Sequence, residues 1–163
     1  MTVYFLDASA VVKRYLTEAG SEYIARLVDP SSANTIILAE ISRVEVAAAI
    51  AARQRAGSQL TIKERDEAVA LMLRHCDREY RMVPLTANVL GRAVELTQNH
   101  RLRGYDAVQL ATALVTNESL RGAGLQELVF VSADDDLMRA TAAERLSSAN
   151  PNRWAKNSTT NSP

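Results

Sequence analysis

The segment of residues 3–9, Val-Tyr-Phe-Leu-Asp-Ala-Ser, constrains the fold of this chain more than any other stretch. Four apolar, strand-prone residues are followed at once by the carboxylate of Asp7, and a helical pattern begins at Ser9. A buried strand that ends in an acid places a charge at the carboxyl edge of a sheet, where open α/β sheets bind their ligands. A second apolar strand, at residues 128–131, is followed by Ser132 and then by the acid Asp134. We therefore expect acids to gather at one edge of a parallel sheet.

Short apolar runs alternate with helical patterns along the chain. This alternation is typical of an α/β fold with a parallel sheet covered by helices on both faces. The length of 163 residues fits one domain, which we place at residues 1–149. Residues 150–163 are rich in Asn, Ser and Thr, and we expect them to form a disordered tail. Strands are predicted at residues 2–6, 35–38, 81–85 and 128–131, and helices at residues 9–17, 21–28, 39–55 and 61–79 and after residues 86, 106 and 134. Ser9 and Thr86 are expected to cap their helices, and Thr61 and Glu64 have capping-box spacing.

Composition excludes several classes of protein. The formal net charge is zero, so a broad, non-specific nucleic-acid coat is not expected, and any nucleic-acid binding requires a local basic patch. The single cysteine, Cys76, rules out an internal disulfide and suits a reducing compartment. No apolar run reaches the length of about 18 residues that a membrane span needs. We therefore expect a cytoplasmic protein without a membrane segment.

Glu45 is the most informative acid outside the strand ends. In the predicted helix over residues 39–55, it falls inside an apolar stripe of Ile41, Val44, Ala48 and Ala52. A carboxylate that faces a core costs several kcal/mol unless it is paired or binds a metal. This pattern therefore indicates a functional acid. In the alternative interpretation, Val46 and Ile50 define the buried face and Glu45 is solvated.

The three aspartates of interest each have an alternative role at a helix start. Asp7 suits an Asx turn or the N-cap of the first helix. Asp106 is followed three residues later by Gln109, which is capping-box spacing. Asp134 also precedes a helix, but it begins a run of three aspartates, which is more acid than a cap requires. A metal site would use Asp134, the member of that run closest to the strand end.

Other catalytic and binding motifs are missing from the sequence. There is no His pair at ligand spacing, no Cys/His zinc set, no GxxxxGK[ST] or GxGxxG loop and no GxSxG elbow. The remaining candidate ligands are oxygens at strand and helix ends, which is the chemistry of Mg²⁺ or Mn²⁺. A phosphoacceptor receiver domain is a rival with the same fold class. It would need an acid beside Asp7 and a lysine after a late strand, and the sequence has neither.

In combination, these motifs resemble the PIN domain, and most closely the VapC-type toxins of bacterial toxin–antitoxin pairs. The resemblance spans residues 1 to about 151 and lies in the order of Phe5-Leu6-Asp7-Ala8-Ser9, Glu45, the GYDAVQLA segment at residues 104–111 and the FVSAD segment at residues 130–134. It implies a three-layer α/β/α fold around a short parallel sheet of four to five strands. Similar chains often end their last helix in Glu-Gly-Leu before a short edge strand. Here residues 144–146 are Glu-Arg-Leu, which puts that strand in doubt.

The resemblance also implies an activity, a cofactor and partners. It implies an endoribonuclease dependent on Mg²⁺ or Mn²⁺, a homodimer, and inhibition by a cognate antitoxin whose tail packs over the site. The acidic catalytic positions would be Asp7, Glu45, Asp106 and Asp134, with Asp7 and Asp106 most directly tied to the metal. Ser9 and Ser132 match small hydroxyl positions that support the site.

For the mechanism, we expect an activated water to attack phosphorus, with neither a covalent protein intermediate nor the RNA 2′-hydroxyl as nucleophile. RNA would be held by cationic side chains near the site, although each of them can instead be a solvated surface residue. The alternative function is a non-catalytic PIN-like module that binds RNA or a protein partner. The candidate RNA-binding residues are Lys13, Arg14, Arg43, Arg101 and Arg103.

Overall fold

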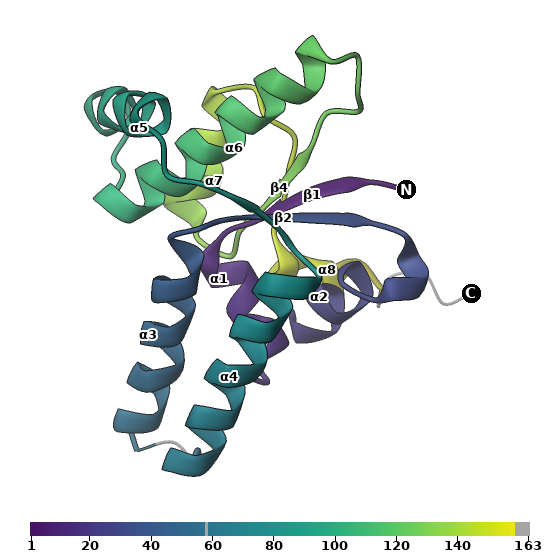
Figure 1. The fold of residues 1–163 in the computed structure, drawn as a ribbon, viewed down its shortest axis with the longest axis vertical. Coiled ribbons are helices and arrows are strands. Elements are labelled where there is room, and N and C mark those ends of the chain that lie inside the picture. The colour runs from purple at the N-terminus through teal and green to yellow at the C-terminus, as the bar shows by residue number, and fades with distance from the viewer. Residues whose placement is uncertain (58, 159–163) are drawn as a thin grey trace.

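A parallel sheet forms the centre of the molecule in a computed structural model that describes residues 1–57 and 59–158. Within these residues, five strands pair in the order β3-β2-β1-β4-β5 (Figure 1). Every pairing is parallel, and Phe5 of β1 lies opposite Ile37 of β2 and Phe130 of β4. The strands are β1 (Val3–Leu6), β2 (Thr35–Ala39), β3 (Arg81–Val83), β4 (Val129–Val131) and β5 (Ser148–Ala149). The predicted three-layer α/β/α architecture is confirmed.

Helices cover both faces of the sheet (Figure 1). One face carries α5 (Ala87–Asn99), α6 (Gly104–Gly122) and α7 (Asp135–Ala143). The opposite face carries α1 (Ala8–Val11), the 3₁₀ turn η1 (Val12–Arg14), α2 (Ser21–Leu27), α3 (Ser42–Arg55) and α4 (Ile62–Arg78). The helices α3 and α4 form a hairpin that extends away from the sheet. No helix in the described part of the chain has both the length and the hydropathy to cross a membrane.

The two cores follow from the alternation of side chains along each strand. Phe5 and Phe130 point toward α5, α6 and α7, where their rings stack with centroids 5.6 Å apart. Their neighbours Leu6 and Val131 point to the other face, against α1 to α4. All four side chains are completely buried. Each such burial stabilises the fold by roughly 2 kcal/mol, and together they fix β1 and β4 side by side.

The position of β1 determines where a site can form. From β1 the chain continues to β2 and β3 on one side of the sheet, whereas β4 and β5 lie on the other side. The connections that leave the carboxyl ends of β1 and β4 therefore diverge, and such a switch point opens a crevice. Asp7 follows β1 and Asp134 lies shortly after β4, so the topology brings both acids to this crevice.

Local sequence signals predicted most helix starts correctly. Thr61 and Glu64 form the predicted capping box, and the side chain of Thr86 caps α5. Three starts differ from the prediction, and one of them is that of α3, which begins at Ser42 rather than at residue 39. The N-cap of α1 is Asp7 rather than Ser9, because the Asp7 carboxylate accepts a hydrogen bond from Ala10 N at 2.9 Å. Asp106 does not cap α6 but lies in its first turn, since the helix already begins at Gly104.

The expected disordered tail over residues 150–163 is wrong for its first part. The chain forms the edge strand β5, whose existence was in doubt, and then α8 (Pro151–Ser158); residues 159–163 lie outside the described part. The polar composition of this segment gave no indication that Trp154 packs against α2. The Trp154 ring lies 5.8 Å from the Tyr23 ring and 4.6 Å from the Arg26 guanidinium carbon. Aromatic and cation–π contacts of this kind contribute about 1 kcal/mol each.

The contact between α8 and the start of α2 predicts a specific sensitivity at Gly20. Its φ of +85° disfavours any side chain, and an added Cβ would lie 2.9 Å from Pro151. We expect Gly20→Ala to lower the free energy of unfolding in urea by about 2–4 kcal/mol through strain and overpacking. The matched control is Gly124→Ala, which has φ +68° but open space around its Cβ, and it should cost only about 1 kcal/mol. Equal losses of unfolding free energy in the two variants would contradict a tight contact between α8 and Gly20. The fluorescence of Trp154, the only tryptophan, reports the detachment of α8.

Candidate active site

One cavity brings the four predicted acids together at the carboxyl edge of the sheet. It has a volume of about 210 Å³. Its wall includes Asp7 from the end of β1, Glu45 from α3, Asp106 from α6 and Asp134 from the start of α7. These residues are far apart in the sequence, so the fold itself assembles the cluster. Ser9 and Gln109 also line the cavity.

Asp7 lies deepest, with 3% of its surface exposed. Its carboxylate accepts hydrogen bonds from Ala10 N, from the Ser9 hydroxyl at 2.8 and 2.9 Å and from the Ser132 hydroxyl at 2.8 Å. Burial raises the pKa of Asp7 to about 7, even though these hydrogen bonds act in the opposite direction. The single Ser9 proton can serve only one carboxylate oxygen at a time. At least one acceptor position on Asp7 therefore stays open to a ligand.

Ser9 and Ser132 join the loops that follow β1 and β4. The Ser9 hydroxyl accepts a hydrogen bond from Ala133 N at 2.9 Å, and the Ser132 hydroxyl accepts one from Asp134 N at 3.1 Å. Each serine thus contacts Asp7 and also holds the backbone beside Asp134. Asp134 itself caps α7 by accepting from Leu137 N at 2.8 Å. Its capping role and its place on the cavity wall therefore exist together.

Glu45 reaches the cavity for a reason that differs from the predicted one. Val46 and Ile50 form the buried face of α3, whereas Val44 is 61% exposed and Ala48 and Ala52 are exposed. The expected apolar stripe around Glu45 is therefore not the core face, and the alternative assignment of that face is correct. Glu45 is nevertheless half-buried, because it faces the cavity.

Charge repulsion acts between neighbouring acids of the cavity. Burial raises the pKa of Glu45, with a further contribution from the charge of Asp106. Burial likewise raises the pKa of Asp106, with a further contribution from the charge of Asp134. The charge of Glu45 also acts on Asp7. A shared cation is the simplest way to relieve such mutual repulsion.

The donor set fits a hard divalent ion that keeps part of its water shell. The cavity offers carboxylate and hydroxyl oxygens, which are ligands of Mg²⁺ and Mn²⁺. Across residues 1–57 and 59–158, no three or more His, Cys, Asp or Glu side chains form a group that could hold a metal ion as it stands. Mg²⁺ does not need one, because it is usually held by one or two carboxylates with several waters.

The structure separates the five candidate RNA-binding residues into two groups. Lys13 is buried and pairs with Glu18 at 2.7 Å. Arg14 binds Glu79 at 2.8 Å, and Arg43 binds Asp77 at 2.9 Å. These three side chains form ion pairs within the fold, and their role in binding RNA stays a prediction. By contrast, Arg101 and Arg103 in the loop before α6 are exposed, and the charge of Arg103 acts on the Asp106 carboxyl.

Sequence reasoning missed the contribution of Gln109 and Ser42. Gln109 was read as the partner of Asp106 in a capping box, but its amide nitrogen donates to Glu45 Oε2 at 2.5 Å and to Ser42 Oγ at 2.9 Å. Both residues are almost completely buried. An amide among the buried apolar residues of α6 was the available signal, because buried polar groups require partners.

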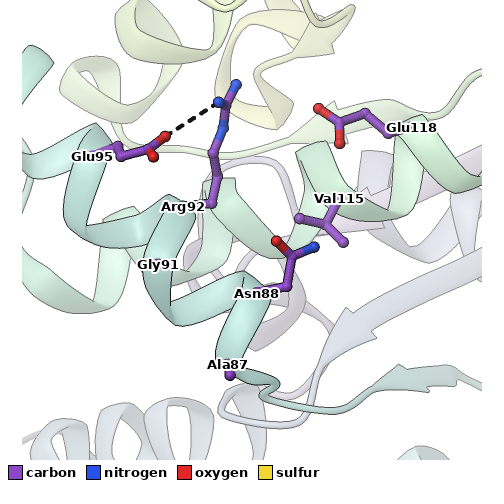
Figure 2. A pocket seen from close by; sticks show the side chains of 7 residues that line it. All are labelled: Ala87, Asn88, Gly91, Arg92, Glu95, Val115 and Glu118. Atoms are coloured by element: carbon purple, nitrogen blue, oxygen red, sulfur yellow. Dashed lines mark hydrogen bonds and ion pairs between the residues drawn. The ribbon is translucent and has the colours of Figure 1, made fainter.

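A second cavity, of about 340 Å³, lies between α5 and α6 and has a different character (Figure 2). Arg92 is bonded there to Glu95 at 3.4 Å, and Glu118 lies on the other wall. Its lining also includes Ala87 and Gly91. Its carboxylates are exposed and are not compensated by buried hydroxyls as Asp7 is. The four-acid cavity is therefore the better candidate for chemistry.

Comparison with known proteins assigns the chain to a family. Residues 4–144 match the PIN domain, and the chain therefore belongs to the PIN-domain family, as predicted. Ribonuclease VapC45 of Mycobacterium tuberculosis (strain CDC 1551 / Oshkosh) is 37% identical over 125 residues, which cover 72% of this chain and 79% of that protein. The predicted resemblance to VapC-type proteins is thus confirmed.

Solved structures support the fold. The crystal structure of VapBC2 from Rickettsia felis, bound to a DNA fragment from the promoter, matches with a TM-score of 0.62 and 15% identity over 91% of this chain and 98% of that chain. VapC20 of Mycobacterium tuberculosis, described as a sarcin-ricin loop cleaving toxin, matches with a TM-score of 0.55 and 18% identity over 85% of this chain and 95% of that chain. At these identities the likeness concerns the fold.

The raised pKa of Asp7 predicts how stability depends on pH in metal-free protein. Because the folded pKa of about 7 exceeds the ordinary value of 3.8, the native state binds more protons than the unfolded state between these values. Stability should therefore fall as pH rises from about 4 to about 7. Asp7→Asn removes this contribution. As pH rises from 4.5 to 8, the free energy of unfolding of Asp7→Asn should therefore increase relative to that of wild type by on the order of 3 kcal/mol.

Urea unfolding in the presence of EDTA measures this difference. Glu45 and Asp106, whose pKa values are also raised, should leave the variant with a weaker slope of the same sign. If the free energies of unfolding of the two proteins changed in parallel with pH, burial would not raise the pKa of Asp7.

Proposed function

We propose that this protein is an endoribonuclease dependent on Mg²⁺ or Mn²⁺ and that it is the toxin of a toxin–antitoxin pair. The observation that carries the proposal is the single cavity lined by Asp7, Glu45, Asp106 and Asp134, where burial and the charges of neighbouring acids raise the pKa values of Asp7, Glu45 and Asp106. A set of acids that is costly without a cation is what metal-dependent phosphodiester hydrolysis requires. The relatives named ribonucleases support RNA as the substrate.

The residues would divide the work as follows. A bound divalent cation would neutralise the acids, polarise the scissile phosphodiester and activate a water for attack on phosphorus. Asp7 and Asp106 are proposed as its principal ligands, and Glu45 and Asp134 as the flanking acids. Ser9 and Ser132 orient Asp7 through the hydrogen bonds described above.

RNA binding is proposed for the basic loop before α6. Arg101 and Arg103 are exposed, and the charge of Arg103 acts directly on the Asp106 carboxyl. A cavity of about 280 Å³ is lined by His100, Arg101, Asp136 and Arg139, of which Arg139 pairs with Asp136. Phosphates on one side of the scissile bond would meet Arg101 and Arg103, which compensates for a net charge of zero.

An antitoxin is proposed as the protein partner. Ala49 of α3 lines the acidic cavity, and the adjoining surface of the same helix exposes Val44, Ala48 and Ala52. This smooth apolar strip could receive the apolar face of a partner segment, from which a tail reaches the acids. A homodimer remains a proposal from family membership.

The metal-dependent activity is tested by cleavage of RNA with purified protein. Asp106→Asn is expected to reduce the cleavage rate by at least about 100-fold, because it removes a ligand whose charge the ion requires. EDTA should abolish cleavage by wild type, and Mg²⁺ or Mn²⁺ should restore it. The matched control is Asp66→Asn, an exposed acid on α4, which should cleave like wild type. Full activity of Asp106→Asn or activity in EDTA would contradict the proposal, and a protein that binds RNA without cleaving it would be the non-catalytic module.

The basic loop is tested by binding of single-stranded RNA to Asp106→Asn protein, which should not consume the ligand. Adding Arg101→Ala or Arg103→Ala should weaken binding about 10-fold and lower the salt slope by roughly one charge. Arg74→Ala is the control, since Arg74 is an exposed residue of α4. If Arg101→Ala and Arg103→Ala bound RNA as tightly as the Arg74→Ala control, the loop would not contact the RNA.

A further inference from the structure

Gln109 lies in the wall of the acidic cavity and connects two helices from opposite faces of the sheet. It projects from α6, and both of its partners belong to the first turn of α3. The starts of these helices lie at the same edge of the sheet (Figure 1). Gln109 has 1% of its surface exposed, so its side-chain amide is almost completely buried in the cavity wall. It thus links the acid on α3 to the helix that carries Asp106.

The hydrogen bonds of Gln109 are directed toward the acid site. The amide nitrogen has two protons, and the contacts to Glu45 Oε2 and Ser42 Oγ use both. The opposite orientation of the amide would place two acceptor oxygens 2.5 Å apart, which charge repulsion forbids. Within the described residues, the amide oxygen Oε1 is buried and has no partner. A buried acceptor without a partner costs about 1–3 kcal/mol.

This arrangement contributes little to the stability of the fold. The neighbouring positions Leu110, Ala111 and Ala113 are buried and apolar, so an apolar side chain would suit the packing of α6. The unpaired oxygen offsets much of what the two hydrogen bonds contribute. Residues that stabilise poorly at a buried position are expected where function constrains the choice. What Gln109 determines is the direction of the Glu45 side chain.

Glu45 needs such a support. It is in the first turn of α3 and extends into a cavity, and its long side chain would otherwise occupy several rotamers. Gln109 is the side chain that hydrogen-bonds the Glu45 carboxylate among the described residues. That bond engages Oε2 and leaves the other carboxylate oxygen available to a ligand.

We propose that Gln109 is a positioning residue for the metal site, which acts by holding Glu45 in the orientation that faces the cation. The inference rests on the proposed function and adds a residue that touches neither metal nor substrate. Removal of such a supporting hydrogen bond in metal sites typically costs 10–100-fold in metal affinity or activity. Ser42 fixes the Gln109 amide in turn.

The test compares Gln109→Met with a control on the same helix. Thr112→Val also removes a buried polar group, since Thr112 is 1% exposed and donates to Val108 O at 2.7 Å, but it has no contact with the acids. Calorimetric titration of metal-stripped protein with Mn²⁺ should show 10–100-fold weaker binding for Gln109→Met and wild-type affinity for Thr112→Val. The rate constant for RNA cleavage should fall with metal affinity, while the KM for RNA changes less than about 2-fold.

Further measurements separate positioning from a structural role. The urea midpoint of metal-free Gln109→Met should stay close to that of wild type. Ser42→Ala retains the bond to Glu45 but releases one anchor of the amide, so it should weaken Mn²⁺ binding only a few-fold, and it provides the same test if Gln109→Met does not fold. The inference would be overturned if Gln109→Met and Ser42→Ala bound Mn²⁺ as tightly as wild type. It would also be overturned if Thr112→Val lost as much Mn²⁺ affinity as Gln109→Met. A wild-type protein that binds no Mn²⁺ would instead overturn the proposed function.

Discussion

The rest of the structure depends on one buried charge, the carboxylate of Asp7 at the end of the central strand. A carboxylate with 3% exposure is tolerated only when its oxygens are hydrogen-bonded. Here the start of α1 supplies one backbone N–H, and Ser9 and Ser132 supply two hydroxyls. Ser132 belongs to the loop after β4, so satisfying Asp7 also fixes the second strand of the switch point. The crevice, its acids and the junction of the two loops are therefore parts of one arrangement.

Three of the four acids have a compensating contact that acts on the pKa, yet the repulsion among the acids is not removed. Serine hydroxyls act on Asp7, the Gln109 amide acts on Glu45 and the charge of Arg103 acts on Asp106. In all three cases burial dominates, and the pKa of the carboxyl stays above its ordinary value. A cluster that only stabilised the fold would pair these acids with cations, as Lys13 is paired with Glu18. The lack of such pairing supports the proposal that a cation from solution binds in the site.

Sequence patterns predicted what local chemistry decides. The strands, the capping box at Thr61 and the motif of strand followed by acid all depend on neighbouring residues, and the structure has them. Features that depend on tertiary contacts could not be predicted. The buried face of α3 was misassigned because its alanines suit either side, and the docking of α8 depends on Tyr23 and Arg26, more than 120 residues away. The spacing of Asp106 and Gln109 fits a capping box equally well, so only the fold reveals that Gln109 faces Glu45.

The central claim is that the four acids together hold a divalent cation. Crystals grown with Mn²⁺ and measured at the manganese absorption edge test it directly, because the anomalous signal locates the ion without reference to activity. The account predicts a peak within coordination distance, about 2.0–2.3 Å, of carboxylate oxygens of Asp7 and Asp106, with Glu45 and Asp134 around it. A fully occupied ion elsewhere, or no peak in the cavity at saturating Mn²⁺ in protein that cleaves RNA, would contradict it.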